Sequence, residues 1–248
     1  MRTHSRLSPS LFAAVGLVLA GQAQAQAEDW SWTVEPYVWA VKIGTDVRTD
    51  VPPIEGSSEM NFKDIIDHLD GSIQVNAEGR TDQQGVFVDF TYLGISDTRN
   101  GNFATTESDL DTRLLEAAWF WTPGMQRDRG LDIFAGVRYL DADIKVAVDP
   151  NNPVFQDRVL DVGDSYLDAM FGGRYTWAPS EKWRITARAD GSVGQTEGSW
   201  NVALQARYQL GPGALSFGYR HLEIDIETGG VRTDLTMDGP LVGYAFKF

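Results

Sequence analysis

Residues 241–248, with the sequence LVGYAFKF, alternate between two kinds of side chain. Apolar and aromatic residues occupy one face of an extended strand, and small or charged residues occupy the other: Val242, Tyr244, Phe246 and Phe248 against Gly243, Ala245 and Lys247. This alternation, ending at an aromatic residue, is typical of the closing strand of a transmembrane β-barrel. It predicts an all-β fold, a single transmembrane antiparallel up-and-down β-barrel in the outer membrane of a Gram-negative bacterium.

The first 27 residues have the pattern of a secretory signal peptide. Arg2 and Arg6 precede a ten-residue apolar run at 11–20, which is too short to span a membrane as a helix. Small residues then offer cleavage after Ala25 or Ala27, and no cysteine follows to carry a lipid anchor. We therefore expect a signal peptide at 1–27 and an exported outer-membrane β-barrel domain at 28–248.

Composition narrows the function classes. Without the two signal-peptide arginines, 19 basic and 35 acidic residues give a net charge of −16. This balance excludes nucleic acid as an expected partner, because phosphate binding needs a basic surface. The chain has no cysteine and three histidines, one of them in the signal peptide. We expect no cofactor and no metal site.

Period-two alternation predicts ten strands, with eight as the alternative. They lie near 30–44, 72–80, 85–96, 108–122, 131–147, 164–178, 182–194, 199–210, 213–227 and 233–248. Short turns at 81–84, 123–130, 179–181 and 211–212 are expected on the periplasmic side, and longer loops at 45–71, 97–107 and 148–163 on the outside. Six of the eight tryptophans fall at the periplasmic strand ends, as in an aromatic girdle: Trp30, Trp32, Trp119, Trp121, Trp177 and Trp183.

The apolar side chains change faces toward the outer ends of several strands. A strand of about 15 residues is about 50 Å long, whereas the apolar band of a barrel is about 25 Å tall. A barrel taller than the membrane would therefore place apolar residues inside its upper part; a β-bulge in each strand, for example near Gly239 and Pro240, is the alternative. The first interpretation predicts an apolar upper pocket lined by Leu140, Ile144, Leu222, Ile224, Leu235 and Met237.

Charged residues occupy the inward face within the membrane. Seven acids and eight bases nearly balance, which predicts a lumen closed by ion pairs, because unpaired charges are costly in a medium of low dielectric constant. An eight-stranded barrel is just filled by side chains, and ten strands are only slightly wider. The predicted network comprises Glu35, Glu78, Arg80, Asp89, Glu116, Asp132, Arg138, Asp168, Arg174, Arg184, Arg188, Asp190, Arg207, Arg220 and Lys247.

Two features remain outside this scheme. Residues 61–70 (NFKDIIDHLD) have apolar residues at helical spacing behind Asn61 as an N-cap, which predicts a short amphipathic helix in the first outer loop. His221 is the one candidate catalytic base on a predicted strand. No serine lies two residues from it on that strand, so we assign no catalytic residue.

The chain resembles a family of Gram-negative outer-membrane β-barrel proteins of unassigned function, loosely similar to the superfamily of OmpA-like, opacity and OmpW-like small barrels. The resemblance rests on PYVWA at 36–40, FKDIIDHLD at 62–70, GVFVDFTYLGIS at 85–96, DIFAGVRYL at 132–140, GGRYTW at 172–177, FGYRHLEID at 217–225 and GPLVGYAFKF at 239–248. It implies the barrel fold and the outer membrane, and it supplies no catalytic or binding residue.

Two functions stay open, and a third is less favoured. The leading hypothesis is a non-catalytic barrel with a structural or surface-interaction role and a closed lumen. The alternative is a narrow channel or binding barrel for a small hydrophobic or polar solute of unknown identity, and the third is an outer-membrane hydrolase. Expected partners are outer-membrane lipid, lipopolysaccharide, and the barrel-assembly machinery, which would recognise the last strand ending in Phe248.

Overall fold

The computed structural model describes residues 29–50, 53–60, 65, 69–100, 104–124, 126–150, 158–228 and 231–248. The predicted signal peptide lies outside these residues. Within them, no helix is long and apolar enough to cross a membrane. They form one 12-stranded sheet with antiparallel pairing throughout. Its strands are β1 (Ser31–Trp39), β2 (Lys42–Asp50), β3 (Pro53–Met60), β4 (Leu69–Arg80), β5 (Gln84–Asn100), β6 (Ala104–Trp121), β7 (Gly130–Pro150), β8 (Arg158–Trp177), β9 (Trp183–Gly194), β10 (Gly198–Leu210), β11 (Gly213–Thr228) and β12 (Val231–Lys247).

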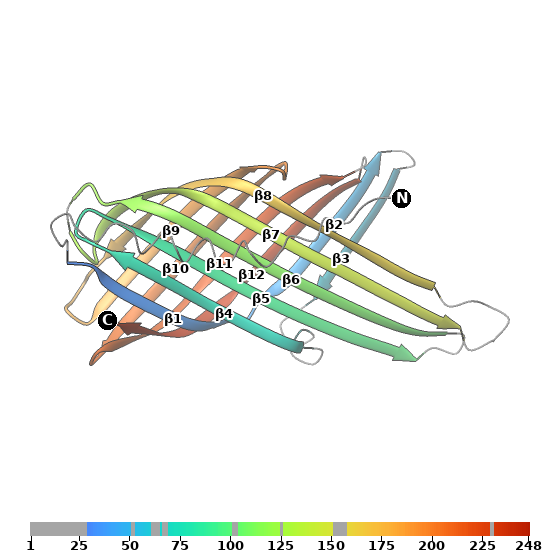
Figure 1. The fold of residues 1–248 in the computed structure, drawn as a ribbon, viewed down its shortest axis with the longest axis horizontal. Helices are drawn as coiled ribbons and strands as arrows, with labels where there is room; N and C mark the ends of the chain where they lie inside the picture. Colours follow the sequence, from blue (N-terminus) through green and yellow to red (C-terminus); the bar gives the residue numbers. More distant parts are fainter. Residues whose placement is uncertain are drawn as a thin grey trace, which may run out of the picture. The chain divides into compact units, whose positions relative to one another are not determined.

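Ten of the strands close into a barrel. β1 and β4 to β12 pair in this order, and β12 returns to β1 with a register from Thr33↔Lys247 to Trp39↔Leu241. Trp32 and Phe248 add two backbone hydrogen bonds of 3.1 and 2.8 Å at the end of this seam. The prediction of ten strands is therefore confirmed, and the alternative of eight is wrong. Figure 1 shows the tilted strands, with the C-terminus at the end of the barrel that carries the short turns. This end is called the short-turn end, and its turns are 81–83, 122–129, 178–182 and 211–212. The opposite end of the barrel is called the far end.

A β-hairpin occupies much of the predicted first outer loop. The first predicted strand ends at Trp39 as β1. β2 then pairs with the half of β12 nearer the far end, starting from Lys42↔Asp238, and β3 pairs with β2. The loop prediction at 45–71 is wrong here, because the pairing with β12 outweighs the proline and acidic residues that are typical of a loop. The predicted helix at 61–70 lies mostly outside the described residues: Ile65 is helical, whereas Leu69 and Asp70 already belong to β4.

The strand break depends on a close backbone approach. Ala40 donates a backbone hydrogen bond of 2.8 Å to Pro240, and the neighbouring Gly239 is so near that an added Cβ would lie 2.2 Å from the carbonyl oxygen of Ala40. A real Cβ does not approach an oxygen so closely, so the backbone must shift. Glycine is therefore required where the first strand bends away from β12.

Gly239→Ala is expected to destabilise the barrel by about 1–3 kcal/mol, the usual cost of overpacking a tight site. Gly44→Ala, in the adjoining hairpin, is the matched control, because its added Cβ would meet only Thr236 at an ordinary 3.7 Å. Urea unfolding of both variants in lipid vesicles, followed by tryptophan fluorescence, measures the difference. Equal stability of the two variants would show that the bend tolerates a side chain.

The outer surface carries an apolar belt. Large apolar side chains on the outward face are 39% to 61% exposed: Val88, Leu131, Ile133, Val137, Phe171, Tyr175, Leu204, Leu215, Phe217, Val242 and Phe246. Trp32, Trp119, Trp121, Trp177 and Trp183 lie at strand ends on the short-turn end, and Trp30 directly precedes β1. So much exposed apolar surface, edged by tryptophan, is the surface that a lipid-facing barrel presents.

The change of face occurs without a bulge in the β11–β12 and β6–β7 pairs, whereas the β4–β5 pair has a register shift between Leu69 and Gly71. The β11–β12 register runs unbroken from Gly213↔Phe246 to Thr228↔Val231, across Gly239 and Pro240. The β6–β7 register is likewise continuous from Ala104↔Pro150 to Trp121↔Ile133. The bulge interpretation is therefore wrong for these two pairs. The strands keep their phase, and the residues that face inward change from polar to apolar toward the far end.

Candidate functional site

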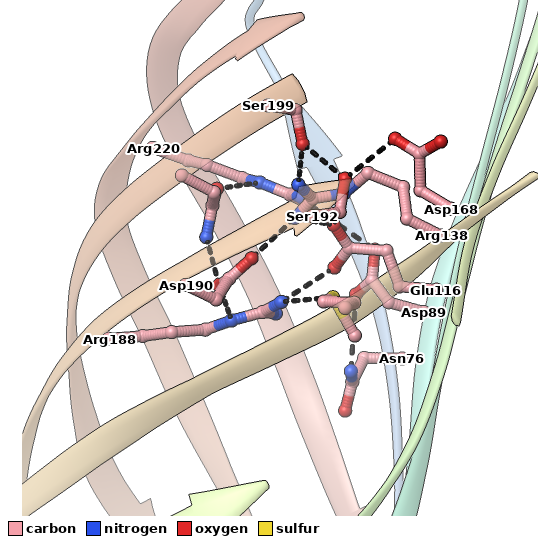
Figure 2. Close-up of polar contacts among 12 residues, drawn as sticks. Asn76, Asp89, Glu116, Arg138, Asp168, Arg188, Asp190, Ser192, Ser199 and Arg220 are labelled. Atoms are coloured by element: carbon pink, nitrogen blue, oxygen red, sulfur yellow. Dashed lines mark hydrogen bonds and ion pairs between the residues drawn. The ribbon is translucent and has the colours of Figure 1, made fainter. Parts of the chain in front are cut away.

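One glutamate binds three arginines at the centre of the lumen. Glu116, on β6, is fully buried, and one of its carboxylate oxygens accepts hydrogen bonds from Arg138 at 2.7 and 2.9 Å and from Arg220 at 2.7 Å. Its other oxygen accepts a bond of 2.9 Å from Arg188. These arginines come from β7, β11 and β9, so the carboxylate ties several walls of the barrel together (Figure 2).

Two aspartates balance the charge of this group. Asp190 accepts from Arg188 at 2.6 Å and also from Arg138, and Asp89 lies 3.4 Å from Arg220. Three carboxylates therefore face three guanidinium groups, which makes the cluster neutral. A buried charge is tolerated when it is paired and hydrogen-bonded in this way. These six residues are called the central network: Asp89, Glu116, Arg138, Arg188, Asp190 and Arg220.

Uncharged side chains complete the central network, and the sequence prediction did not include them. Tyr37 and Asn76 donate to Asp89 at 2.9 and 3.1 Å. Asn201 donates to one network carboxylate at 2.7 Å and accepts from a network arginine at 2.8 Å, and Ser199 accepts from another network arginine. All four lie on the inward face of their strands. Their polar side chains on the inward face of predicted strands are the sequence signal that could have identified them.

A second ion-paired group lies nearer the short-turn end. Arg174 contacts Glu78 at 2.6 Å and Asp132 at 2.8 Å, and Arg80 contacts the same two carboxylates at 3.4 Å each. The guanidinium carbon of Arg174 lies 4.5 Å from the ring centroid of Phe120, a cation–π contact. These two arginines and two acids form another neutral cluster, held against the aromatic side of the lumen.

Glu35 and Arg207 form a third ion pair, which lines the smaller cavity together with Glu78 and Arg174. The guanidinium lies 2.5 Å from the carboxylate, which also accepts from Gln205 at 2.9 Å and from Ser216. Glu35 is almost fully buried, so this pair, too, joins strands that are far apart in sequence, β1 and β10.

Three residues of the predicted network have other partners. Asp168 accepts from the Ser192 hydroxyl at 2.9 Å and from the backbone of the 195–197 turn, so it holds the β9–β10 connection in place. Arg184 donates to backbone carbonyls of 180, 181 and 183 at 3.1 to 3.2 Å. Lys247 lies 3.3 Å from Asp128 in the turn after β6.

The apolar residues predicted to line an upper pocket pack together. Leu140, Leu222, Ile224 and Met237 are at most 2% exposed, and Leu235 packs against them. The backbone of the sixth residue, Ile144, lies in β7, and its side chain lies outside the described part of the chain. The cluster also includes Trp39, Val41, Ile43, Ile65, Leu93, Ile95 and Leu114. This apolar layer argues against the empty pocket that binding of a hydrophobic solute would need.

Two cavities lie on the short-turn side of the central network. The larger, of about 310 Å³, reaches from the turn residues Asp128 and Lys182 inward to Arg174. The smaller, of about 100 Å³, shares Arg174 with it and ends at Arg220 and Leu241. Both cavities therefore lie between the short-turn end and the central network, whose residues Asp89, Arg188 and Arg220 line the smaller one.

His221 lies on the outward face of β11. Its ring centroid is 4.6 Å from that of Trp200, and its Nε2 is 3.8 Å from Glu223. The histidine thus has an aromatic and an acidic neighbour at the surface.

Comparisons with known proteins find likenesses of fold. No family model matches the chain, and neither does any curated protein. Similar solved structures include the attachment invasion locus protein Ail of Yersinia pestis (9% identity, 88% of this chain and 98% of Ail, TM-score 0.41) and the outer-membrane protease OmpT of Escherichia coli (9%, 92% and 99%, 0.37). The N-terminal barrel domain of Pseudomonas aeruginosa OprF is similar at 11% identity over 88% and 97%, with a TM-score of 0.30. These values concern the barrel fold alone and carry no argument about function.

Proposed function

We propose that the protein is an integral barrel of the Gram-negative outer membrane, with a non-catalytic structural or surface-interaction role and a closed lumen. The exposed apolar belt and its tryptophans support the membrane location, since such a belt edged by aromatic residues is typical of a barrel surface in contact with lipid. The short-turn end would face the periplasm, and the far end, with the β2–β3 hairpin, would project outward. Lipid, lipopolysaccharide and the barrel-assembly machinery acting on β12 are its proposed partners.

The proposal that the lumen is closed rests on the central network. An ion crossing the barrel would have to displace guanidinium–carboxylate contacts of 2.6 to 2.9 Å at Glu116 and Asp190. Each displaced group would remain buried and unpaired, which costs several kcal/mol. The apolar layer adjoins this network, with Trp39 contacting Arg220, and offers an ion no polar partner.

Single-channel recording tests this proposal. The mature barrel, refolded and inserted into a planar bilayer at neutral pH, is expected to give no discrete openings. A heat-dependent shift on a gel verifies folding, and a general porin added afterwards verifies that the bilayer reports channels. Reproducible openings of the folded protein would overturn the closed lumen and favour the alternative, a narrow channel.

A further inference from the structure

Three aspartates lie side by side across β11, β12 and β2 near the far end of the barrel. Asp234 on β12 is directly opposite Asp225 on β11 and also directly opposite Asp46 on β2. Residues paired in this way share one face of the sheet with their Cβ atoms about 4.5–5.5 Å apart, and like charges at such positions destabilise the pairing. These three residues are called the acidic row. The register of the sheet therefore brings three carboxylates together that repel one another when ionised.

The acidic row lies beyond the apolar belt. On the outward face of β11, the exposed apolar residues Leu215 and Phe217 are followed toward the far end by Glu223 and Asp225. Asp225 and its neighbour in the row, Asp234, are only partly buried. The row is therefore outside the surface assigned to lipid, and its carboxylates can exchange protons with water.

Acidic groups surround Asp225. Glu223 and Glu227 are the adjacent outward residues of the same strand, and Asp234 faces it from β12. On the other side, Glu197 in the β9–β10 turn donates its backbone N–H to the Asp225 carbonyl at 2.9 Å. Burial, and then the charges of Asp234 and Glu223, raise the pKa of Asp225 above its ordinary value. The paired strands therefore favour the protonated form of Asp225 more than a separated strand does.

Nearby arginines compensate only part of the acidic row. Arg48 lies 3.6 Å from Asp234, and Arg232 lies 3.0 Å from Glu227, which is outside the row. Both ion pairs are exposed, and exposed pairs contribute little. Among the described residues, neither Asp46 nor the aspartate on β11 has an ion-pair partner. Two of the three charges in the row are therefore not compensated by an ion pair.

We infer that the acidic row is a pH-sensitive clasp: protonation of Asp225 in mildly acidic medium tightens the pairing of β11, β12 and β2 at the far end, and ionisation at neutral pH loosens it. A group whose pKa is raised by folding gives stability that is complete below its ordinary pKa and is lost as the pH rises through the raised value. The clasp acts on the apolar layer, because Ile224 and Leu235, the neighbours of the row in β11 and β12, pack in that layer. Loosening the strands at neutral pH therefore gives water more access to the layer.

Hydrogen–deuterium exchange of the refolded mature barrel in lipid vesicles tests this inference. After correction for the pH dependence of intrinsic exchange, the amides of 223–236 are expected to exchange about two- to fivefold more slowly at about pH 4 than at neutral pH, the range for a cross-strand pair of like charges. Asp225→Asn, which imitates the protonated form, is expected to give the slow exchange at neutral pH and to lose most of the pH dependence. Asp143→Asn removes the same charge from an exposed position on β7 and is expected to leave these amides unchanged.

Two further readouts separate the clasp from a general effect of acid. The amides of 132–140 in β7 are the internal reference, because loss of charge in the lumen ion pairs would speed exchange throughout the barrel. Added salt screens like charges and is expected to slow exchange at 223–236 at neutral pH. Exchange there that does not slow on acidification, that salt does not change, or that is equal in Asp225→Asn and Asp143→Asn would overturn the inference. None of these readouts depends on whether the lumen is closed.

Discussion

Glu116→Gln is expected to destabilise the barrel by about 3–5 kcal/mol, the usual cost of removing one partner from a buried ion pair. The substitution keeps the shape of the side chain and removes one of three negative charges that face three arginines. Arg138, Arg188 and Arg220 would then share the two remaining carboxylates, Asp89 and Asp190. The remaining charge excess lies in a site from which water is largely excluded, where it is poorly screened.

Urea unfolding in lipid vesicles, with tryptophan fluorescence and the heat-dependent gel shift as probes, measures this loss. Glu223→Gln is the matched control, since Glu223 is a partly exposed glutamate on the outward face of β11, and its change is expected to stay within about 0.5 kcal/mol. A loss at Glu116 no larger than that of the control would show that the three arginines do not depend on this carboxylate.

A double variant tests whether charge balance is the cause. Arg138→Met combined with Glu116→Gln leaves two arginines and two aspartates, with Arg188 still bound to Asp190 and Arg220 still near Asp89. The double variant is expected to lose less than the sum of the single losses, with a coupling of about 0.5–3 kcal/mol. Additive losses would instead indicate that packing, not charge, holds the centre of the lumen.

Much of the architecture could be predicted because period-two alternation is a local signal. The strand from Leu241 onward fixes which face meets lipid, and the inward phase of Glu116, Arg138 and Asp190 follows from counting along each strand. The change from polar to apolar inward residues at Leu222 and Ile224 could be predicted in the same way. Each of these statements needs only the neighbours in the same strand.

The contacts within the lumen could not be predicted because they depend on register and closure. Arg220 and Glu116 are 104 residues apart, and they meet only once ten strands close with a particular stagger. The contacts of Asp168 could not be predicted for the same reason. The ion-pair interpretation assigns Asp168 to an arginine, whereas its donors are the Ser192 hydroxyl and the backbone of the β9–β10 turn. The β2–β3 hairpin was missed because β12 stabilises it from the other end of the chain.

Trp39→Ala is expected to cost about 3–5 kcal/mol, the range for removing a large aromatic side chain from a core. Trp39 is 1% exposed, its indole donates to the Gly239 carbonyl at 3.2 Å, and the Arg220 guanidinium lies 5.0 Å from its ring. It therefore joins the central network to the apolar layer. The expected loss includes both the vacated volume and the buried polar groups left without a neighbour.

The size of this loss distinguishes a packed layer from an empty pocket. If Leu222, Met237 and their neighbours enclosed solvent, the space vacated by the Trp39 side chain would fill with water, and the loss in Trp39→Ala would be small. Trp39→Phe, which keeps one aromatic ring and loses the indole donor and part of the ring volume, is expected to cost about 1–2 kcal/mol. Trp121→Ala, on the exposed rim, is the comparison for a tryptophan outside the core. A Trp39→Ala loss no greater than that of Trp121→Ala would mean that the far half of the lumen is open, and the search for a solute would then move there.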